Sequence, residues 1–460
     1  MESTPIAKLI EWSGGRLERG SASGTAVAVE TDSRRDCAGA VFVPLVGEKF
    51  DGHEFIASAA ARGAAGCLTS KDIAAGLPES FAAIRVADTL KAYQAIARGY
   101  RRTLPAKVAA ITGSCGKTTT KNMLANALSR KKITKTEKNE NNEVGVPLTL
   151  LRMDSTTEIA VLEFGMRGRG QIAELAEIAE PELGLITNIE PSHIGILGSM
   201  EAICDAKGEL LERLPARGTA VLNADSEWFD RLAKKTLARI VSFGMEKGDY
   251  RAAGAKMRLD GSSFTIETPF GRAEIESSLT GRGAIINAAA VAAAAMELGE
   301  PLDAVAEGLA MDIGEAGRMR RVGTADGKLL IDDTYNSSPA SLAMTLELLG
   351  TVEWSGRRVA ALGDMKELGD FSRNEHFRIG RDFAAKSADA LVTVGFEAKA
   401  IAEGALSAGM REDGVAAFET FEEFAESGAG LFGPGDLVLV KGSRAMGMER
   451  VVKFIEEASK

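Results

Sequence analysis

The stretch Val108–Lys121, with the sequence V-A-A-I-T-G-S-C-G-K-T-T-T-K, decides the fold. Its apolar start, Val108–Ile111, predicts a buried parallel strand, and a helix is expected to begin near Lys117. The glycines of the loop between them allow backbone N–H groups to close around an anion, and the positive end of the helix dipole points to the same place. The sequence therefore predicts a strand, a phosphate-binding loop and a helix in succession.

The loop also carries the side chains that a nucleoside triphosphate requires. Lys117 is placed to reach the terminal phosphates, and the Thr118 hydroxyl can ligate the Mg²⁺ that accompanies them. The spacing G-x-x-G-K-T is two residues shorter than the common G-x-x-x-x-G-K-[ST] pattern. A glycine-rich turn that merely caps a helix is the alternative, but the flanking strand and helix favour phosphate binding. The predicted phosphate-binding residues are Gly113, Ser114, Cys115, Gly116, Lys117, Thr118 and Thr119.

Length and composition exclude several classes of protein. The chain has 460 residues, which predicts about three domains of roughly 150 residues each. Its formal net charge of −10 argues against binding to nucleic acid or to an acidic membrane. No stretch approaches the roughly 20 apolar residues of a membrane span, and the N-terminus has no signal-peptide pattern. The four cysteines form no C-x-x-C pair, so neither a disulfide framework nor a zinc site is indicated, and a cytoplasmic location is expected.

Residues 1–103 are predicted to form an α/β domain without a nucleotide loop. Short apolar runs indicate strands, and His53–Arg62 indicates a helix. Thr31–Arg34 follows one strand and offers hydroxyl groups and a guanidinium, a set suited to phosphate or carboxylate. Gly47–His53 is a loop with glycines that ends where the helix starts. Ordinary strand-end turns are the alternative for both segments, and the residues alone do not decide between the two interpretations.

Residues 104–315 are predicted to form the nucleotide domain around a parallel sheet. Glu163 follows an apolar strand at the sheet edge where such folds bind ligands, and it can hold Mg²⁺ directly or through water. His193 follows another strand at the same edge, where a metal or phosphate role and a structural role are both open. Lys207 lies in a helix among acidic residues, for which a surface ion pair is the ordinary interpretation.

Two further segments of this domain have distinct patterns. Tyr250–Ser278 alternates apolar and polar residues between turns and predicts a small β-meander. Gly281–Leu298 is an alanine-rich helix with Asn287 near its start. A polar side chain that faces a buried surface needs a hydrogen-bond partner, and the edge of a purine would serve.

Residues 316–460 have a βαβ periodicity and predict a third domain with a doubly wound sheet. Four apolar runs indicate strands, and polar side chains follow three of them. These polar residues are Asp332, Asp333, Asp364, Lys441, Ser443 and Arg444. Because the carboxyl ends of parallel strands meet at one edge of a sheet, the three strand ends together indicate a second ligand-binding surface.

Taken together, the motifs resemble those of the Mur ligases, ATP-dependent enzymes that form amide bonds in peptidoglycan precursors. The family-wide motifs are I-T-G-S-C-G-K-T-T, E-F-G at Glu163, T-N-I-x-P-S-H ending at His193, A-K-G-E at Lys207, the helix with Asn287, G-R-M at Arg318 and D-D-T-Y-N. The runs T-x-x-N-x-N-N-E-x-G-V-P-L-T-L-L, D-D-T-Y-N-S-S-P, L-G-D-M-x-E-L-G and V-K-G-S-R-x-M-x-M-E are closer to one branch, which adds a D-alanyl-D-alanine dipeptide to a UDP-linked tripeptide. The resemblance covers nearly the whole chain.

The resemblance implies both a fold and a reaction. The fold would have an N-terminal UDP-binding domain, a central ATPase domain and a C-terminal Rossmann-like domain. The reaction would join D-Ala-D-Ala to UDP-N-acetylmuramoyl-tripeptide (UDP-MurNAc-tripeptide) through an acyl phosphate and give the pentapeptide for peptidoglycan synthesis. ATP and Mg²⁺ are the expected cofactors, the two small molecules are the expected partners, and a monomer is expected.

Residue roles follow from the same resemblance. Lys117 and Thr118 would hold the γ-phosphate and Mg²⁺. Glu163 and His193 would serve the metals. Lys207 matches a lysine that carries a carbamate in this family, which would turn a cation into a metal-binding carboxylate.

The other implied contacts belong to the nucleotide and the substrates. Asn287 would meet adenine, Arg318 the phosphates and Asp333 the ribose of ATP. The uridine diphosphate would contact Ser33, Arg34, Gly47, Asp51 and His53. The sugar and peptide would lie along three residues of a segment that, by composition alone, is an ordinary surface loop: Asn139, Asn141 and Asn142. The peptide or the incoming dipeptide would face Tyr335, Asn336, Asp364, Lys441 and Arg444.

Three alternatives stay in view. The sister ligase that adds the third-position diamino acid to a dipeptide has a His-containing motif after the aspartate and its own Arg-bearing motif, and neither is present here. Folylpolyglutamate synthase shares the ATPase core but lacks the UDP domain, whereas residues 1–103 are present. A nucleotide-binding scaffold without catalysis predicts damage to Lys117, Glu163 or Lys207, and all three are in place.

The chain also departs from the family pattern near His193. Ile194–Gly198 stands where the family usually has an acidic residue and a Phe before the Gly. Ser192 replaces a common Ala, and Cys115 lies inside the phosphate loop. These differences leave the positioning of groups near His193 open.

Overall fold

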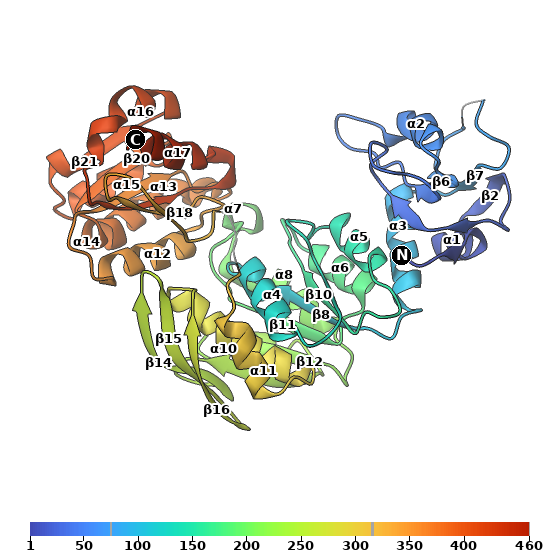
Figure 1. Ribbon diagram of the computed structural model, residues 1–460, viewed down its shortest axis with the longest axis horizontal. Helices are drawn as coiled ribbons and strands as arrows, with labels where there is room; N and C mark the ends of the chain where they lie inside the picture. The colour runs from blue at the N-terminus through green and yellow to red at the C-terminus, as the bar shows by residue number, and fades with distance from the viewer. Residues whose placement is uncertain (74–75, 314–316, 460) are drawn as a thin grey trace.

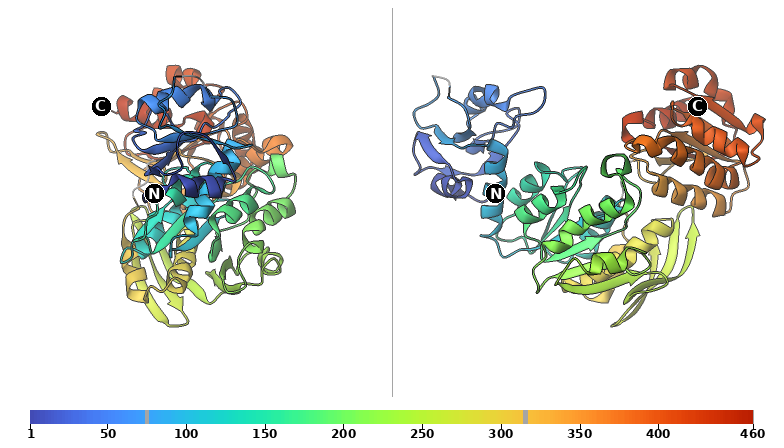
Figure 2. Two further views of the ribbon diagram at one scale, coloured as in Figure 1. Left: turned by 90° about the vertical axis from the view of Figure 1, so that its right-hand side faces the viewer. Right: turned by 180° about the vertical axis from the view of Figure 1, so that it is seen from behind.

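Three α/β domains follow one another along the chain in the computed structural model, which describes residues 1–73, 76–313 and 317–459. Figure 1 shows a bent arrangement in which the central domain lies between the two others. The view from behind in Figure 2 shows the same arrangement, with the N-terminal and C-terminal domains standing apart. The predicted fold class is confirmed. The boundary predicted at 103/104 stays a prediction, and the boundary predicted at 315/316 falls outside the described residues.

The N-terminal domain contains a five-stranded sheet in the order β2–β7–β6–β5–β4, in which only β2 runs antiparallel to its neighbour. Its strands are β2 (Arg16–Arg19), β4 (Ala28–Glu30), β5 (Ala40–Phe42), β6 (Gly66–Thr69) and β7 (Ala82–Arg85), with a separate pair of β1 (Thr4–Pro5) and β3 (Thr25–Ala26). Its helices are α1 (Ile6–Ser13), α2 (Ile56–Ala61) and α3 (Thr89–Arg101). The helix expected over 53–62 begins as a 3₁₀ turn, η1 (Gly52–Phe55), and continues as α2.

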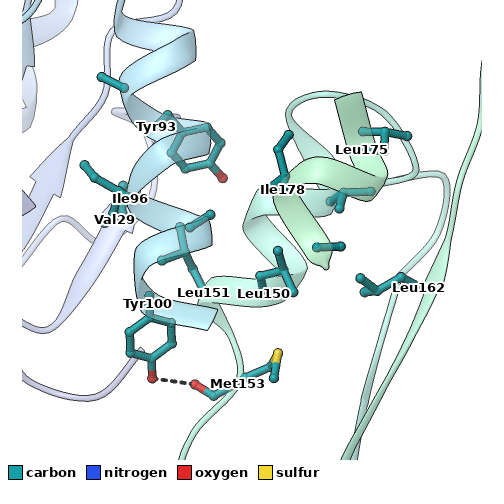
Figure 3. Packing of buried hydrophobic residues seen from close by; sticks show 14 of the residues in the cluster. Val29, Tyr93, Ile96, Tyr100, Leu150, Leu151, Met153, Leu162, Leu175 and Ile178 are labelled. Atoms are coloured by element: carbon teal, nitrogen blue, oxygen red, sulfur yellow. Dashed lines mark hydrogen bonds between the residues drawn. The ribbon is translucent and has the colours of Figure 1, made fainter. Parts of the chain in front are cut away.

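Helix α3 attaches this domain to the central one. Figure 3 shows its side chains Tyr93 and Tyr100 turned toward the segment that carries Leu150 and Met153, while Ile96 lies on the other side of the helix beside Val29. The Tyr100 hydroxyl donates a 2.7 Å hydrogen bond to the Met153 carbonyl. All of these residues are buried in one apolar cluster, so removal of their surface from water stabilises the junction. The two domains are therefore joined by a packed helix face rather than by a loop alone.

The central domain contains a nine-stranded sheet in the order β16–β15–β14–β13–β12–β11–β8–β10–β9. Its strands are β8 (Lys107–Thr112), β9 (Ile133–Lys135), β10 (Ile159–Glu163), β11 (Leu183–Ile186), β12 (Thr219–Asn223), β13 (Arg239–Gly244), β14 (Tyr250–Arg258), β15 (Gly261–Thr268) and β16 (Gly271–Ser277). The pairs from β9 to β14 are parallel, whereas β14, β15 and β16 pair antiparallel and confirm the predicted meander. β8 and β10 are almost wholly buried, which explains their continuous apolar runs.

Helices pack against this sheet. They are α4 (Lys117–Ala127), α5 (Gly145–Leu151), α6 (Gln171–Ala179), α7 (Ile194–Leu197), α8 (Met200–Glu212), α9 (Phe229–Ala233), α10 (Arg282–Glu297) and α11 (Leu302–Ala310). The alanine-rich α10 is buried along most of its length in the cluster that contains β8 and α4. Small side chains permit this close packing.

The C-terminal domain contains a six-stranded sheet in the order β17–β18–β22–β19–β20–β21, parallel except for β17. Its strands are β17 (Arg320–Gly323), β18 (Leu329–Asp333), β19 (Arg358–Gly363), β20 (Ala390–Val394), β21 (Val415–Phe418) and β22 (Leu437–Lys441). Its helices are α12 (Pro339–Thr351), α13 (Ser372–Ile379), α14 (Ala385–Ser387), α15 (Lys399–Ser407), α16 (Phe421–Ser427) and α17 (Glu449–Ala458). Since β22 lies between β18 and β19, the three polar strand ends do meet at one edge, as predicted. Within the described ranges, no helix is long and apolar enough to cross a bilayer.

Candidate functional site

The loop between β8 and α4 has a path that its two glycines make possible. Gly113 and Gly116 have φ angles of 149° and 79°, a region that favours glycine. A Cβ on Gly113 would overlap the Thr187 hydroxyl, and a Cβ on Gly116 would overlap the Asn287 amide. The loop therefore lies directly against two neighbouring segments, and α4 begins at Lys117 as predicted.

A second loop, residues 187–190 after β11, holds the phosphate loop in place. The Asn188 side chain accepts the Cys115 N–H at 2.9 Å and donates to the Cys115 carbonyl at 3.1 Å. The Ser114 hydroxyl donates to the Glu190 carbonyl and accepts the Glu190 N–H, both at 2.8 Å. The Thr187 hydroxyl donates to the Cys115 carbonyl at 2.7 Å. Sequence reasoning assigned no role to Thr187, Asn188 or Glu190, although the T-N-I-x-P-S-H motif contains all three.

Two lysines converge on the same backbone carbonyl of this loop. Lys117 Nζ donates to the Gly113 carbonyl at 2.8 Å and to the Ser114 carbonyl at 3.3 Å. Lys207 Nζ, from α8, donates to the Gly113 carbonyl at 3.0 Å. Lys207 is only 1% exposed, so the surface ion pair expected from its acidic neighbours is wrong. Burial, together with the nearby Lys117 charge, holds the pKa of the Lys207 amine well below its ordinary value.

Glu163, at the end of β10, is buried with one unpaired oxygen. Its Oε1 accepts a 2.8 Å hydrogen bond from the Asn141 amide, and its backbone N–H donates to the Thr136 hydroxyl. Its Oε2 has no hydrogen-bond partner among the described residues. A buried carboxylate oxygen without a partner is costly, and a cation would satisfy it. This orphaned oxygen fits the predicted Mg²⁺ site.

The described residues hold no group of three or more His, Cys, Asp or Glu side chains that could bind a metal by themselves. Mg²⁺ sites in nucleotide enzymes commonly use one or two protein oxygens and take their other ligands from phosphates and water. Thr118 and Glu163 supply two such oxygens in the cleft described below, so the residues present fit a Mg²⁺ bound together with phosphates.

The C-terminal domain contacts this site through Arg318, Tyr335 and a residue that faces His193. Arg318 donates to the Thr118 hydroxyl at 3.0 Å, and its guanidinium lies 4.0 Å from the centre of the Tyr335 ring. His193 Nδ1 lies 2.5 Å from the Glu367 carboxylate, which follows β19. The segment after His193, which differs from the family pattern, forms α7. Its Ile194 is buried in an apolar cluster that includes residues of the C-terminal domain.

A cleft of about 1460 Å³ lies between the central and C-terminal domains and gathers most of the predicted residues. Those that line it are Ser114, Cys115, Gly116, Lys117, Thr118, Thr119, Asn141, Glu163, His193, Asn287, Arg318, Asp333, Tyr335, Asn336, Lys441 and Arg444. Lys441 pairs with Asp333 at 2.5 Å, so the ends of β18 and β22 are joined at the cleft wall. The cleft thus connects the carboxyl edges of two sheets.

Other predicted residues lie elsewhere and make structural contacts. Asn142 accepts the Gly145 N–H at 3.0 Å at the start of α5, while Asn139 is exposed. Asp364 is only 2% exposed, and it accepts the Ala398 N–H at 2.7 Å. These three side chains do not line the cleft, and their substrate roles stay predictions.

The five predicted residues of the N-terminal domain lie away from this cleft. Ser33 is buried, and Arg34 pairs with Asp32 through contacts of 2.8 and 2.7 Å. Gly47 donates its N–H to the Phe50 carbonyl in the adjoining loop.

Asp51 and His53 form a small network in the same domain. The His53 ring donates from Nδ1 to Asp51 at 2.6 Å and accepts the Ser70 N–H at Nε2. Hydrogen bonds from Lys71 and His53 lower the pKa of the Asp51 carboxyl. The structure groups these residues around one loop, and a role in binding uridine diphosphate stays a prediction.

Comparison with known proteins adds family information to this geometry. The sequence model of the Mur ligase family catalytic domain matches residues 26–101, the Mur ligase middle domain matches 111–295, and the Mur ligase glutamate ligase domain matches 317–444. A UDP-N-acetylmuramoyl-tripeptide--D-alanyl-D-alanine ligase from Escherichia coli is 35% identical and covers 99% of both chains. The Bacillus subtilis protein of the same name is also 35% identical, over 94% of this chain and 93% of its own.

Solved structures show the same likeness. The crystal structure of MurF from Acinetobacter baumannii superposes with a TM-score of 0.92 at 32% identity, over 99% of both chains. That of the MurF ligase from Thermotoga maritima, in complex with ADP, superposes with a TM-score of 0.81 at 28% identity, over 94% of this chain and 97% of its own.

The contact between Asn141 and Glu163 gives a prediction for the substitution Gly165→Ala. A Cβ on Gly165 would lie 2.8 Å from the Asn141 side-chain oxygen and would displace the amide that orients Glu163. Loss of such a partner commonly weakens a metal site by about 10-fold or more, so we expect ADP affinity in the presence of Mg²⁺ to fall by about that factor. Isothermal titration calorimetry measures this affinity.

The matched control is Gly168→Ala, because no atom lies within 4 Å of a Cβ at that position. Its Mg²⁺-dependent ADP affinity should equal that of the wild type. Equal losses in the two variants, or no loss in either, would contradict the role given to Asn141.

Proposed function

The chain belongs to the Mur ligase family, and we propose that it joins D-Ala-D-Ala to UDP-MurNAc-tripeptide at the expense of ATP, giving the pentapeptide precursor of peptidoglycan. The observation that carries the proposal is the cleft in which the phosphate loop, the orphaned Glu163 oxygen and the polar strand ends of the C-terminal sheet face one another. Relatives of matching length that bear this ligase name support the substrates, and a relative crystallised with ADP supports the nucleotide.

Amide formation from a carboxylate in water is uphill, so the carboxylate must first be activated. The terminal carboxylate of the tripeptide attacks the γ-phosphorus of ATP, and ADP leaves. The amine of D-Ala-D-Ala then attacks the carbonyl carbon of the resulting acyl phosphate. Inorganic phosphate leaves, and the amine loses a proton. Each product molecule therefore accompanies one ADP and one phosphate.

The first step brings two anions together, and the cleft supplies positive groups for it. Lys117 and Arg318 line the cleft, and the N-terminus of α4 directs its backbone N–H groups at the phosphate loop. Fixed cations and N–H dipoles stabilise the charge that develops on a transferred phosphoryl group without having to reorganise. Lys117 now donates to loop carbonyls, so its amine is already held beside the phosphate position.

Thr118, Glu163 and His193 are the residues that would hold Mg²⁺. The ion, when bound, neutralises phosphate charge and acts as a Lewis acid toward the phosphoryl oxygens. Asn141 orients Glu163 for this purpose through its 2.8 Å hydrogen bond, which differs from the substrate contact that the sequence predicted for Asn141.

ATP, D-Ala-D-Ala and the UDP-linked tripeptide would each be held by residues of different domains. Asn287, whose amide lies against Gly116, would meet adenine, and Asp333, from the C-terminal domain, would meet the ribose. Tyr335, Asn336, Lys441 and Arg444 face the peptide or the incoming dipeptide, and the N-terminal domain holds the uridine diphosphate. Approach of the domains around bound substrates would shield the acyl phosphate from water. The monomeric state and the cytoplasmic location stay predictions.

Lys207 is proposed to carry a carbamate. Its burial favours the neutral amine, and a neutral amine is the form that attacks carbon dioxide. The attack forms an N–C bond and releases a proton, so the carbamate replaces a neutral amine with an anion beside the phosphate loop, where a cation would balance it.

With ¹³C-labelled bicarbonate, the wild-type protein should therefore show a protein-bound carbamate carbon signal in its NMR spectrum. The signal should disappear in Lys207→Arg and persist in Lys132→Arg, which changes an exposed lysine. A signal that survives in Lys207→Arg would assign the carbamate to another residue, and absence of the signal from the wild type would contradict the proposal.

Phosphate release tests the proposed reaction as a whole. Release from ATP should require both UDP-MurNAc-tripeptide and D-Ala-D-Ala, and mass spectrometry should show the pentapeptide product. Lys117→Met should lower the rate by at least about 100-fold, because it removes a fixed charge at the transferred phosphoryl group. Lys132→Met, at an exposed position, should leave the rate unchanged.

The other outcomes separate the rival functions. Release that requires a UDP-linked dipeptide and a diamino acid would assign the chain to the sister reaction. No release with either pair of substrates, despite intact ADP binding, would identify a nucleotide-binding scaffold.

A further inference from the structure

Two residues in unusual backbone conformations face each other across the boundary between the central and C-terminal domains. His193, which precedes α7, has a φ angle of 57°, and Glu367, which follows β19, has a φ angle of 66°. Residues other than glycine are uncommon in this left-handed region. Such strained conformations persist only where the surrounding structure holds them, and they gather at functional sites.

The side chains of these residues meet in the cleft. His193 Nδ1 lies 2.5 Å from a Glu367 carboxylate oxygen, and Nδ1 makes no regular hydrogen bond with any described residue. Both residues line the cleft. Glu367 is exposed to solvent, and a glutamate side chain in contact with water is ionised at neutral pH.

The backbones around the pair are also in direct contact. The Gly195 N–H donates to the Glu367 carbonyl at 3.3 Å. A Cβ on Gly195 would lie 2.5 Å from the Gly369 nitrogen, so this approach requires glycine. Ile194 and Leu368, which flank the contact, are buried in one apolar cluster. Packing and backbone approach therefore fix the relative position of the two loops, and the pair is not a chance meeting of mobile side chains.

The loop that carries Glu367 is held to its own domain as well. The Met365 N–H donates to Nε2 of the buried His376 at 2.9 Å, and the Lys366 N–H donates to the Ser443 hydroxyl at 2.8 Å. Burial lowers the pKa of His376, which keeps its Nε2 free to accept. Glu367 is thus presented to the central domain from a fixed point on the C-terminal sheet.

We propose that Glu367 is a positioning residue that sets the tautomer of His193 for metal binding. Its carboxylate takes the Nδ1–H, which leaves the lone pair of Nε2 available to the metal. Histidines that bind metals commonly donate their second ring N–H to a carboxylate, which fixes both tautomer and orientation. The inference rests on the proposed function, because it takes His193 as a metal ligand.

This assignment couples the metal site to the domain arrangement. His193 belongs to the central domain, whereas Glu367 belongs to the C-terminal domain, and no other described carboxylate forms an ion pair with His193. The metal site is therefore complete only while the two domains are in contact. The opposite role, in which Glu367 holds His193 away from the metal, makes the opposite prediction for metal affinity.

Mn²⁺ binding in the presence of ADP, followed by electron paramagnetic resonance, distinguishes the two roles. Glu367→Ala should weaken Mn²⁺ binding by about 10-fold or more. Glu367→Gln should restore part of the affinity, because an amide oxygen can still accept the Nδ1–H. The matched control is Glu403→Gln, which removes a surface carboxylate of the same domain paired with Arg373, and it should bind Mn²⁺ as the wild type does. Glu367→Met repeats the test if the alanine variant does not fold.

The tautomer itself is measured by ¹⁵N NMR of the histidine rings in the full chain. The sequence has only three histidines, and Nε2 of both His53 and His376 accepts a backbone N–H, at 3.1 and 2.9 Å. These two rings are internal references for the Nδ1–H tautomer. With Mg²⁺ and ADP, His193 should match them in the wild type and depart from them in Glu367→Ala.

The possible failures are distinguishable. Unchanged Mn²⁺ affinity and an unchanged His193 tautomer in Glu367→Ala would overturn the positioning role alone. Tighter Mn²⁺ binding in that variant would show that Glu367 competes with the metal, which also overturns it. A wild-type protein that binds ADP but no Mn²⁺ would overturn the proposed metal site as well.

Discussion

The turn Gly113–Gly116 is the feature on which the rest of the cleft depends, because its path excludes side chains at both glycines. Asn188 and its neighbours hold the turn from the side of β11, Lys207 holds it from α8, and Asn287 lies against it from α10. The sheet order β10–β8–β11 explains this arrangement, since it places one strand end on each side of the turn. The predicted phosphate-binding loop is therefore held in place by the sheet itself.

A second sheet faces the first across the cleft, and this is what permits a reaction between two anions. The central sheet contributes the phosphate loop, and the C-terminal sheet contributes polar strand ends such as Asp333 and Lys441, which pair at 2.5 Å. Arg318 and the pair of His193 with Glu367 connect the two walls. The groups that would bind the two anionic reactants are thus divided between the carboxyl edges of two sheets.

The local parts of this site could be predicted from the sequence, whereas the parts that depend on packing could not. The glycine spacing and the Lys–Thr pair indicate the phosphate loop because all of them lie within a few residues of one another. The alternation of apolar and polar residues indicates the meander for the same reason. Lys207 has acidic neighbours along the chain, yet the fold buries it, and no local pattern records that burial. The contact of Asn142 is local and could have been predicted, because its side chain accepts the N–H of Gly145 three residues later. The partner of Asn141 could not be predicted, because Asn141 lies in a loop and Glu163 is 22 residues further along the chain, at the end of β10.

The most direct test of the account is to follow oxygen from the substrate. UDP-MurNAc-tripeptide with ¹⁸O in its terminal carboxylate would be incubated with ATP and D-Ala-D-Ala, and the released phosphate analysed by mass spectrometry. If the carboxylate attacks the γ-phosphorus in the cleft, one ¹⁸O atom must pass to each phosphate released. Phosphate without ¹⁸O, released together with the pentapeptide, would contradict activation through an acyl phosphate.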